Sequence, residues 1–300
     1  HTVLGVVTVP RVLPRILRLP DAEDGSVRMV TLSGIVAQFL SELFEGYEVT
    51  GHAAFRVTRN SELYVNEEEA DNLLEEIAES LENRRKGDVV RLEIEDRAPP
   101  RLVRFLTTQF EVDEDRLYRA DGPVNLNRIS TIYDLVQRPE LKDRPFSPAE
   151  VNLPSEPDAF FESLREGDVM LHHPYESFST VIDFIRMAVL DPRVLAIKQT
   201  LYRTGEDSQV VEALIDAADQ GKEVTVLVEL KARFDEASNI EWAKQLEESG
   251  VHVVYGLVGM KTHCKLSMLV RRDEDRLRRY VHLGTGNYNH QTARFYTDIG

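Results

Sequence analysis

The chain has 300 residues, of which 42% are hydrophobic and 29% charged, and its formal net charge at pH 7 is −16. The apolar fraction excludes a disordered chain, and the single cysteine, Cys264, excludes a disulfide scaffold and fits a reducing compartment. The acidic balance argues against a general nucleic-acid-binding protein, and no apolar run reaches the length of a membrane span. The sequence begins at His1 without a methionine or a signal-peptide pattern, so we expect a segment of a longer protein.

The first half alternates short β-like runs with amphipathic runs, which predicts an α+β domain. Its predicted elements are strands at 27–31, 53–57 and 89–94, and helices at 33–44, 67–82, 101–109 and 125–135. Residues 61–83 carry nine acidic side chains and no basic one, which indicates a solvated helix face. No motif in this half carries chemistry.

A proline-rich stretch separates the two halves. Five prolines fall between Arg138 and Pro157, which is typical of a linker or an extended crossing segment. We therefore predict one domain at 1–148 and a second domain at 149–300.

The second half is a more regular alternation of strands and helices. Its predicted strands are 168–172, 194–202, 223–230, 251–255, 264–270 and 279–283, and its helices are 177–190, 209–220 and 237–248. The nearly continuous Val/Leu run at 223–230 is typical of a strand buried on both faces of a parallel sheet. The order predicts an α/β domain with a mostly parallel sheet covered by helices.

Ligands of open α/β sheets bind beyond the carboxyl ends of the strands. The residues that follow the first four predicted strands include His172, His173, Arg203, Lys231, Arg233 and Lys261. Three of these four ends therefore carry a cation in an acidic chain, which favours phosphate binding, because arginine makes bidentate contacts to phosphate oxygens. Ordinary surface salt bridges to acids such as Asp235 are the alternative.

The segment His263-Cys264-Lys265 has the sharpest chemical signal. On a strand, alternate residues share a face, so we expect His263 and Lys265 on one face and Cys264, with the apolar residues after it, toward the core. Neutral imidazole is a good nucleophile toward phosphorus, and lysine neutralises charge on the transferred group. A purely structural histidine is the alternative.

A glycine-rich segment, Gly284-Thr285-Gly286-Asn287-Tyr288-Asn289, follows the last predicted strand. Its glycines allow backbone N–H groups to approach an anion, and Asn287 is placed to bond the imidazole or a phosphate oxygen. The segment is no Walker A loop, and the chain has no CxxC or HExxH zinc pattern.

Five motifs together resemble the first family of polyphosphate kinases and, more distantly, the phospholipase D superfamily. They are 171–178, 197–203, 229–236, 261–265 and 284–289, and they stand in the family's order over essentially the whole chain. The phospholipase D pattern carries an aspartate where this chain has Val270, so that fuller signature is broken.

The resemblance implies an α+β head domain at 1–148 that forms the dimer, with residues 11–15 at a candidate surface. It implies a phospholipase D-like catalytic domain at 149–300, truncated at its C-terminus. The implied activity is reversible transfer of the terminal phosphate of ATP to polyphosphate through a phosphohistidine. Further catalytic parts are expected beyond Gly300 and before His1, so we expect the isolated fragment to be inactive.

The resemblance also implies roles for individual residues. His263 is the phosphorylated histidine, Lys265 contacts phosphate, and Tyr296 contacts the nucleotide. Arg203 and Arg233 match a magnesium and phosphate site, where guanidinium groups clamp phosphates because they cannot ligate a cation. Asn287 and Lys261 are further phosphate-binding candidates. The cations expected to line a polyphosphate tunnel are Arg203, Arg233, Lys231, Lys261, Lys265, Arg271 and Arg272.

The implied cofactor is Mg²⁺, and the implied partners are ATP or ADP and inorganic polyphosphate, without nucleic acid or a membrane span. A homodimer or homotetramer in the cytoplasm is expected, with the inner membrane surface as a second location. Two rival interpretations remain open: a phospholipase D-type phosphodiesterase and a non-catalytic polyanion-binding module.

Overall fold

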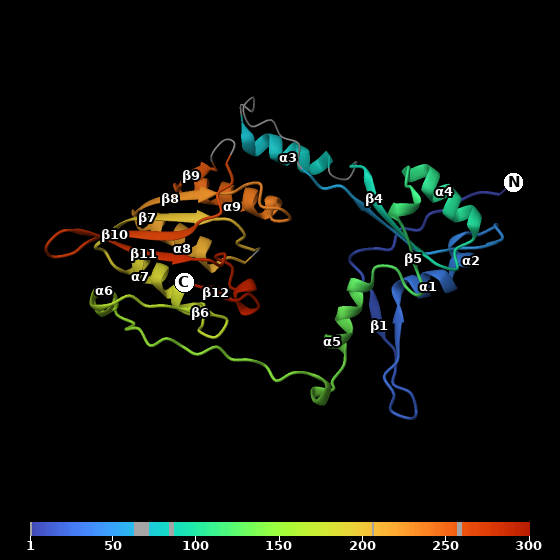
Figure 1. Cartoon of the computed structure of the whole chain (residues 1–300), viewed down its shortest axis with the longest axis horizontal. Coiled ribbons are helices and arrows are strands. Elements are labelled where there is room, and N and C mark those ends of the chain that lie inside the picture. The colour runs from blue at the N-terminus through green and yellow to red at the C-terminus, as the bar shows by residue number, and fades with distance from the viewer. Residues whose placement is uncertain (1, 63–71, 84–86, 206, 257–259) are drawn as a thin grey trace. The chain divides into compact units, whose positions relative to one another are not determined.

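The computed structural model describes residues 2–62, 72–83, 87–205, 207–256 and 260–300, and the chain forms two compact units (Figure 1). The first unit comprises residues 1–62 and 84–144, and the second comprises 63–83 and 145–300. Helix α3 (Leu73–Asn83) thus belongs to the second unit, where it packs on helix α9. The predicted boundary at 148 places α3 in the first domain, whereas its contacts place it in the second unit. The part of the predicted helix at 67–71 lies outside the described residues.

The first unit is built on a three-stranded sheet in the order β3-β4-β5. Strand β3 (Phe55–Arg59) runs antiparallel to β4 (Val89–Glu95), and β5 (Leu117–Ala120) runs parallel to β4. Helix α4 (Pro100–Phe110) starts at a proline, whose fixed φ suits the first helical turn, and its buried side chains join the core of β4. That core contains Val89, Leu92, Ile94, Ala98, Val103, Leu106 and Val112.

The remaining elements of this unit are short. They are β1 (Ile16–Arg18), β2 (Met29–Thr31), α1 (Leu32–Gln38), α2 (Leu40–Leu43), α5 (Ile132–Leu135), and 3₁₀ helices at Glu114–Arg116, Leu126–Thr131 and Pro139–Leu141. The Thr31 hydroxyl caps α1 by accepting a hydrogen bond from the Gly34 N–H at 3.1 Å. Strands β1 and β5 are not among the elements predicted from the sequence.

The second unit contains a five-stranded sheet in the order β11-β10-β7-β8-β9. Strands β7 (Val194–Leu201), β8 (Glu223–Val228) and β9 (His252–Tyr255) are parallel. Strands β10 (Lys265–Arg272) and β11 (Leu277–Gly284) form an antiparallel hairpin, and β10 is also antiparallel to β7. The sheet is therefore mixed, and the prediction of a mostly parallel sheet is wrong, because two of its four strand pairs are antiparallel. The short turn between β10 and β11 can join only antiparallel strands.

Four helices pack with this sheet (Figure 1): α6 (Pro157–Glu166), α7 (Ser179–Leu190), α8 (Gln209–Asp219) and α9 (Glu236–Glu248). Ser208 caps α8 through its hydroxyl. Ile185, Leu214 and Leu246 are fully buried against the sheet residues Ile197 and Leu269. Among the helices that the structure describes, none is long and apolar enough to span a membrane.

The strand predicted at 168–172 is wrong. Strand β6 covers only His172–His173 and pairs with β12 (Asp298–Ile299), outside the five-stranded sheet. Pro174 follows at once, and a residue without an N–H group cannot extend the ladder.

The predicted faces of β10 are also wrong. Lys265, Ser267 and Leu269 are buried, whereas Leu266 is partly buried and Cys264 is exposed. The register explains this, because Ser267 lies opposite Gln199 and Leu269 lies opposite Ile197, on the face covered by the helices.

The end of β10 at Arg271 holds a buried ion-pair network. The Arg271 guanidinium is 2% exposed, donates to Asp191 at 2.8 Å and to Asp158 at 2.7 Å, and also pairs with Asp273. Burial by itself raises the pKa of Asp273, but hydrogen bonds from Tyr280 and Arg271 outweigh it and hold that pKa below its usual value.

We predict that Arg271→Met lowers the free energy of unfolding by about 3–5 kcal/mol, because Asp191 and Asp273 lose their buried partner and keep only the more exposed Arg193 and Arg278. The neighbouring Arg272 is exposed, so Arg272→Met is the matched control and should change stability by less than about 0.5 kcal/mol. Urea unfolding followed by circular dichroism measures both. Equal losses for the two variants would contradict a stabilising role for the network.

Candidate active site

Four chain segments meet at one edge of the five-stranded sheet. Because β7 and β8 are parallel and β10 is antiparallel to β7, the ends of β7 and β8 lie beside the start of β10 and the end of β11. This edge carries Arg203 after β7, Arg233 after β8, His263 and Lys265 at the start of β10, and the glycine-rich turn after β11. The topology thus brings most of the predicted site residues to one place.

The imidazole of His263 is exposed and lies against Lys265. The Lys265 Nζ is 3.0 Å from Nε2 and 3.1 Å from Nδ1 of His263. Partial desolvation and the positive charges of Lys265, Lys261 and Arg203 lower the pKa of His263 below its usual 6.5. The ring is therefore neutral at pH 7 and keeps a lone pair for nucleophilic attack.

Tyr202 lies at the centre of a cluster that consists of His263, Lys261, Lys265 and Arg203. The sequence analysis missed Tyr202 as a site residue. Its ring is 8% exposed and meets the His263 ring edge-on at a centroid distance of 4.9 Å. The Lys265 Nζ, the Lys261 Nζ and the Arg203 Cζ lie 5.0, 5.5 and 5.7 Å from its centroid. The negative face of an aromatic ring attracts cations, so Tyr202 helps to hold three positive groups near each other. An aromatic residue directly before Arg203 at a strand end was the available signal.

Lys265 is only 4% exposed, although it is charged. Burial lowers the pKa of Lys265, and the negative charge of Asp298 opposes that shift. The ammonium group is therefore placed at the site with little freedom to move away from His263.

Arg203 links the loops that follow β7 and β8. Its Nη2 donates to the Arg233 carbonyl oxygen at 3.1 Å, and its Nε lies 3.3 Å from Asp235 Oδ2. Between these two partners, Phe234 is 79% exposed and adopts a left-handed φ of 72°. A bulky residue rarely takes this conformation, so the loop stores strain beside the site.

The Thr200 side chain fixes the start of β10. Its hydroxyl donates to the Cys264 carbonyl oxygen at 2.8 Å and accepts from the Leu266 N–H at 2.9 Å. Cys264 and Leu266 flank Lys265 and come directly after His263. The Thr200 hydroxyl therefore fixes the backbone that carries the His263 and Lys265 side chains.

The glycine-rich turn packs closely against Asp298. A side chain at Gly286 would place its Cβ 2.6 Å from Asp298 Oδ2, so this position requires glycine. The Asn287 Oδ1 is buried and has no hydrogen-bond partner in the described part of the chain. Nearby, the Tyr288 hydroxyl and His282 Nδ1 share a hydrogen bond of 2.8 Å, and burial lowers the pKa of His282 to about 4. His282 is therefore neutral at pH 7.

Several predicted residues do not join the cluster. Tyr296 is 63% exposed after a 3₁₀ helix at Thr292–Arg294, and none of its described contacts reaches His263. Arg271 and Arg272 lie at the other end of β10, about 20 Å or more from its start at the usual rise per residue, so they do not join the cluster around His263. His173 is buried against Phe178, with its Nδ1 2.8 Å from the Glu176 carbonyl oxygen.

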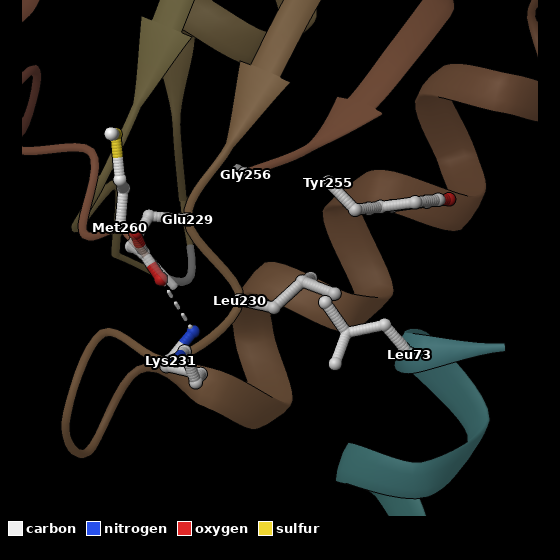
Figure 2. Close-up of a pocket in the computed structure, with 7 residues that line it drawn as sticks. All are labelled: Leu73, Glu229, Leu230, Lys231, Tyr255, Gly256 and Met260. Atoms are coloured by element: carbon white, nitrogen blue, oxygen red, sulfur yellow. Dashed lines mark hydrogen bonds between the residues drawn. The ribbon is translucent and has the colours of Figure 1, made fainter. Parts of the chain in front are cut away.

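A small pocket adjoins the loop after β8 (Figure 2). Leu73, Leu230 and Met260 give it apolar walls, and the Glu229 carboxylate points toward the backbone of Lys231, as the dashed line in Figure 2 marks. Its largely apolar lining distinguishes it from the cationic cluster around Tyr202.

The donor set at this edge does not fit a magnesium ion held by the protein. Mg²⁺ takes oxygen ligands, whereas the clustered side chains are arginine, lysine and histidine. Within the described ranges, no group of three or more His, Cys, Asp or Glu residues is arranged to hold a metal ion. Arg203 and Arg233 are thus suited to phosphate oxygens and not to the cation itself.

Comparison with protein families gives two consecutive matches. A model described as the polyphosphate kinase middle domain matches residues 1–132, and one described as polyphosphate kinase C-terminal domain 1 matches residues 159–300. The polyphosphate kinase of Xylella fastidiosa strain Temecula1 is 53% identical over 298 residues, which is 99% of this chain and 42% of that protein. The enzyme of Burkholderia lata is 49% identical over 305 residues, which is 100% of this chain and 44% of that protein. The chain therefore spans less than half the length of these relatives.

Among solved structures, the polyphosphate kinase of Porphyromonas gingivalis is similar with a TM-score of 0.69 and 28% identity, covering 96% of this chain and 41% of that one. A phospholipase D family member from Salmonella typhimurium gives a TM-score of 0.33 at 14% identity, which is too low for a shared fold to be inferred.

We predict that Lys265→Met raises the pKa of His263 toward 6.5, because one of the charges that disfavour the imidazolium is gone. The rise remains incomplete, since desolvation is the larger cause. Histidine-selective NMR titration measures the shift. Lys244→Met removes a charge from an exposed position of α9 and should leave the titration unchanged. A pKa that stays the same or falls in Lys265→Met would contradict the electrostatic coupling.

Proposed function

Because the chain belongs to the polyphosphate kinase family, we propose that it supplies the phosphohistidine site of an enzyme that reversibly transfers the terminal phosphate of ATP to inorganic polyphosphate. The observation that carries this proposal is the neutral, exposed imidazole of His263 surrounded by Lys265, Lys261 and Arg203. A nucleophile among fixed cations suits a reaction at an anionic phosphorus centre.

In the first step, a ring nitrogen of His263 attacks the γ-phosphorus of ATP in line with the leaving oxygen. A nitrogen–phosphorus bond forms, the bond from the γ-phosphorus to the bridging oxygen breaks, and ADP leaves with that oxygen. In the second step, a terminal oxygen of polyphosphate attacks the phosphorus. The nitrogen–phosphorus bond breaks, and neutral imidazole is restored.

The surrounding cations lower the barrier of both steps. The transferred phosphoryl group carries negative charge on its equatorial oxygens, and charge neutralisation and positioning supply most of the catalysis in such reactions. Lys265 is within reach of the group on His263, while Arg203 and Arg233 are proposed as clamps on the flanking phosphates. Lys261, Asn287 and Tyr296 are proposed as further contacts to phosphate or nucleotide.

Mg²⁺ is proposed to arrive with the nucleotide, held by phosphate oxygens, where it would neutralise phosphate charge. We also propose that the second unit is a phospholipase D-like domain. The protein is proposed to form a dimer or tetramer in the cytoplasm. The phosphodiesterase alternative shares the histidine nucleophile but needs no nucleotide, and the binding-module alternative forms no covalent intermediate.

We predict that the intact protein, incubated with γ-labelled ATP and magnesium, acquires an acid-labile, base-stable label. His263→Ala should abolish the label, because it removes the attacking nitrogen. His252→Ala is the matched control, since His252 is exposed on β9 and should keep full labelling.

The rival functions give different results. Absence of label on a folded, ATP-binding protein would reject the phosphohistidine mechanism and favour the binding module. Hydrolysis of a phosphodiester without nucleotide, lost in His263→Ala, would favour the phosphodiesterase.

We also predict that Arg203→Ala lowers the turnover number by on the order of 100-fold with the fold retained, because it removes a preorganised positive charge. Steady-state synthesis of polyphosphate measures the effect, and circular dichroism tests the fold. Arg186→Ala, at an exposed site on α7, is the control for removal of one arginine. Normal turnover in Arg203→Ala would overturn its role as a clamp.

A further inference from the structure

We infer that Glu229 is the positioning residue of this site: its buried carboxylate fixes the backbone of both His263 and Arg233 relative to the sheet. This inference rests on the proposed function for its catalytic meaning. Its structural content is independent of that function, because it concerns how two segments are held.

Both carboxylate oxygens of Glu229 accept backbone hydrogen bonds. Oε2 accepts from the Thr262 N–H at 2.8 Å, and Oε1 accepts from the Lys231 N–H at 3.1 Å. Thr262 directly precedes His263, and Lys231 begins the short loop that leads to Arg233. One side chain therefore joins the nucleophile segment, 33 residues further along the chain, to the clamp segment, which begins two residues after Glu229.

The backbone of Glu229 is anchored as well. Its N–H donates to the Leu201 carbonyl oxygen at 3.0 Å, and its own carbonyl oxygen accepts from the buried Asn239 Nδ2 at 3.0 Å. The same Asn239 amide donates to the Tyr202 carbonyl oxygen at 2.8 Å. The base of the Glu229 side chain is thus fixed to the end of β7, immediately before Arg203.

The residue is poorly suited to any role that needs contact with solvent or substrate. Glu229 is 2% exposed, and its oxygens are already used by two N–H groups. Burying a carboxylate is costly unless hydrogen bonds and nearby charge compensate. At Glu229 the backbone N–H groups of Lys231 and Thr262 supply such hydrogen bonds, and the same two bonds order the segments that lead to Arg233 and His263.

Two substitutions separate geometry from charge. Glu229→Gln keeps the shape but offers only one acceptor oxygen, so its NH₂ group faces an N–H donor and one of the two bonds is lost. Glu229→Asp keeps the charge but is one methylene shorter and does not span both donors. Glu223→Gln is the matched control, because Glu223 is an exposed carboxylate at the other end of β8.

The pKa of His263 in the intact protein is the decisive readout. It is measured from the pH dependence of ethoxyformylation by diethyl pyrocarbonate at the exposed imidazole, with peptide mass spectrometry, and requires no enzymatic activity. If Glu229 positions His263, release of the Thr262 segment moves the imidazole away from Lys265, and the pKa rises in both Glu229→Gln and Glu229→Asp. If Glu229 acts only through its charge, Glu229→Gln lowers the pKa further and Glu229→Asp leaves it unchanged.

Kinetics supply the second readout. We expect the rate of phosphoenzyme formation at saturating ATP to fall at least 10-fold in both variants, with a smaller change in the KM for ATP and wild-type behaviour in Glu223→Gln. Unchanged pKa and rate in a folded Glu229→Asp would overturn the inference. A raised pKa in a protein whose wild type never forms a phosphoenzyme would support the positioning role and reject the proposed function. Should Glu229→Gln fail to fold, Glu229→Asp, which keeps the buried charge, decides the question alone.

Discussion

The candidate site depends on holding several positive charges close together despite their mutual repulsion. Lys261, Lys265 and Arg203 surround one tyrosine ring, and each of them also disfavours protonation of His263. Left to itself, such a cluster would spread, since flexible cationic side chains gain both entropy and electrostatic energy by moving apart. The sheet edge prevents this by burying Lys265, by tying Arg203 to the neighbouring loop, and by placing Tyr202 between the charges. Under the proposed function, the phosphate groups of the substrates would balance this positive charge.

The sequence was a good guide to elements and a poorer guide to contacts. The Val/Leu run of β8, the Gly and Pro residues at element ends, and cations after two strands predicted most of the second unit and the location of the site, because these signals are local. The faces of β10 were assigned wrongly because Lys265, Ser267 and Arg271 are polar yet buried, and their partners lie elsewhere in the chain. Arg271 meets Asp191 across 80 residues, and Leu266 meets Thr200 across 66. Pairings of this kind depend on tertiary structure, so they cannot be inferred from the periodicity of apolar residues in the sequence.

Strand β10 uses charge for two different purposes at its two ends. At Arg271, the guanidinium pairs with three carboxylates, which neutralise its charge within the fold. At Lys265, burial is similar, but its hydrogen-bond contact is an uncharged imidazole, and the negative charge of Asp298 and the positive charge of Arg203 act on it from nearby. Composition alone cannot distinguish the two ends, because both appear as basic residues on one strand. The carboxylates that pair directly with Arg271 distinguish the stabilising end from the end that we propose binds an anion.

The exposure of Cys264 has a consequence for experiments on this protein. The thiol stands between His263 and Lys265 in the sequence and is open to solvent, while its carbonyl oxygen is held by Thr200. An alkylating or oxidising reagent that reaches this sulfur would add bulk or negative charge on the residue next to His263 in the chain. Inactivation by thiol reagents, and its prevention by a bound polyanion, would therefore measure access to the neighbouring imidazole and would not indicate cysteine catalysis.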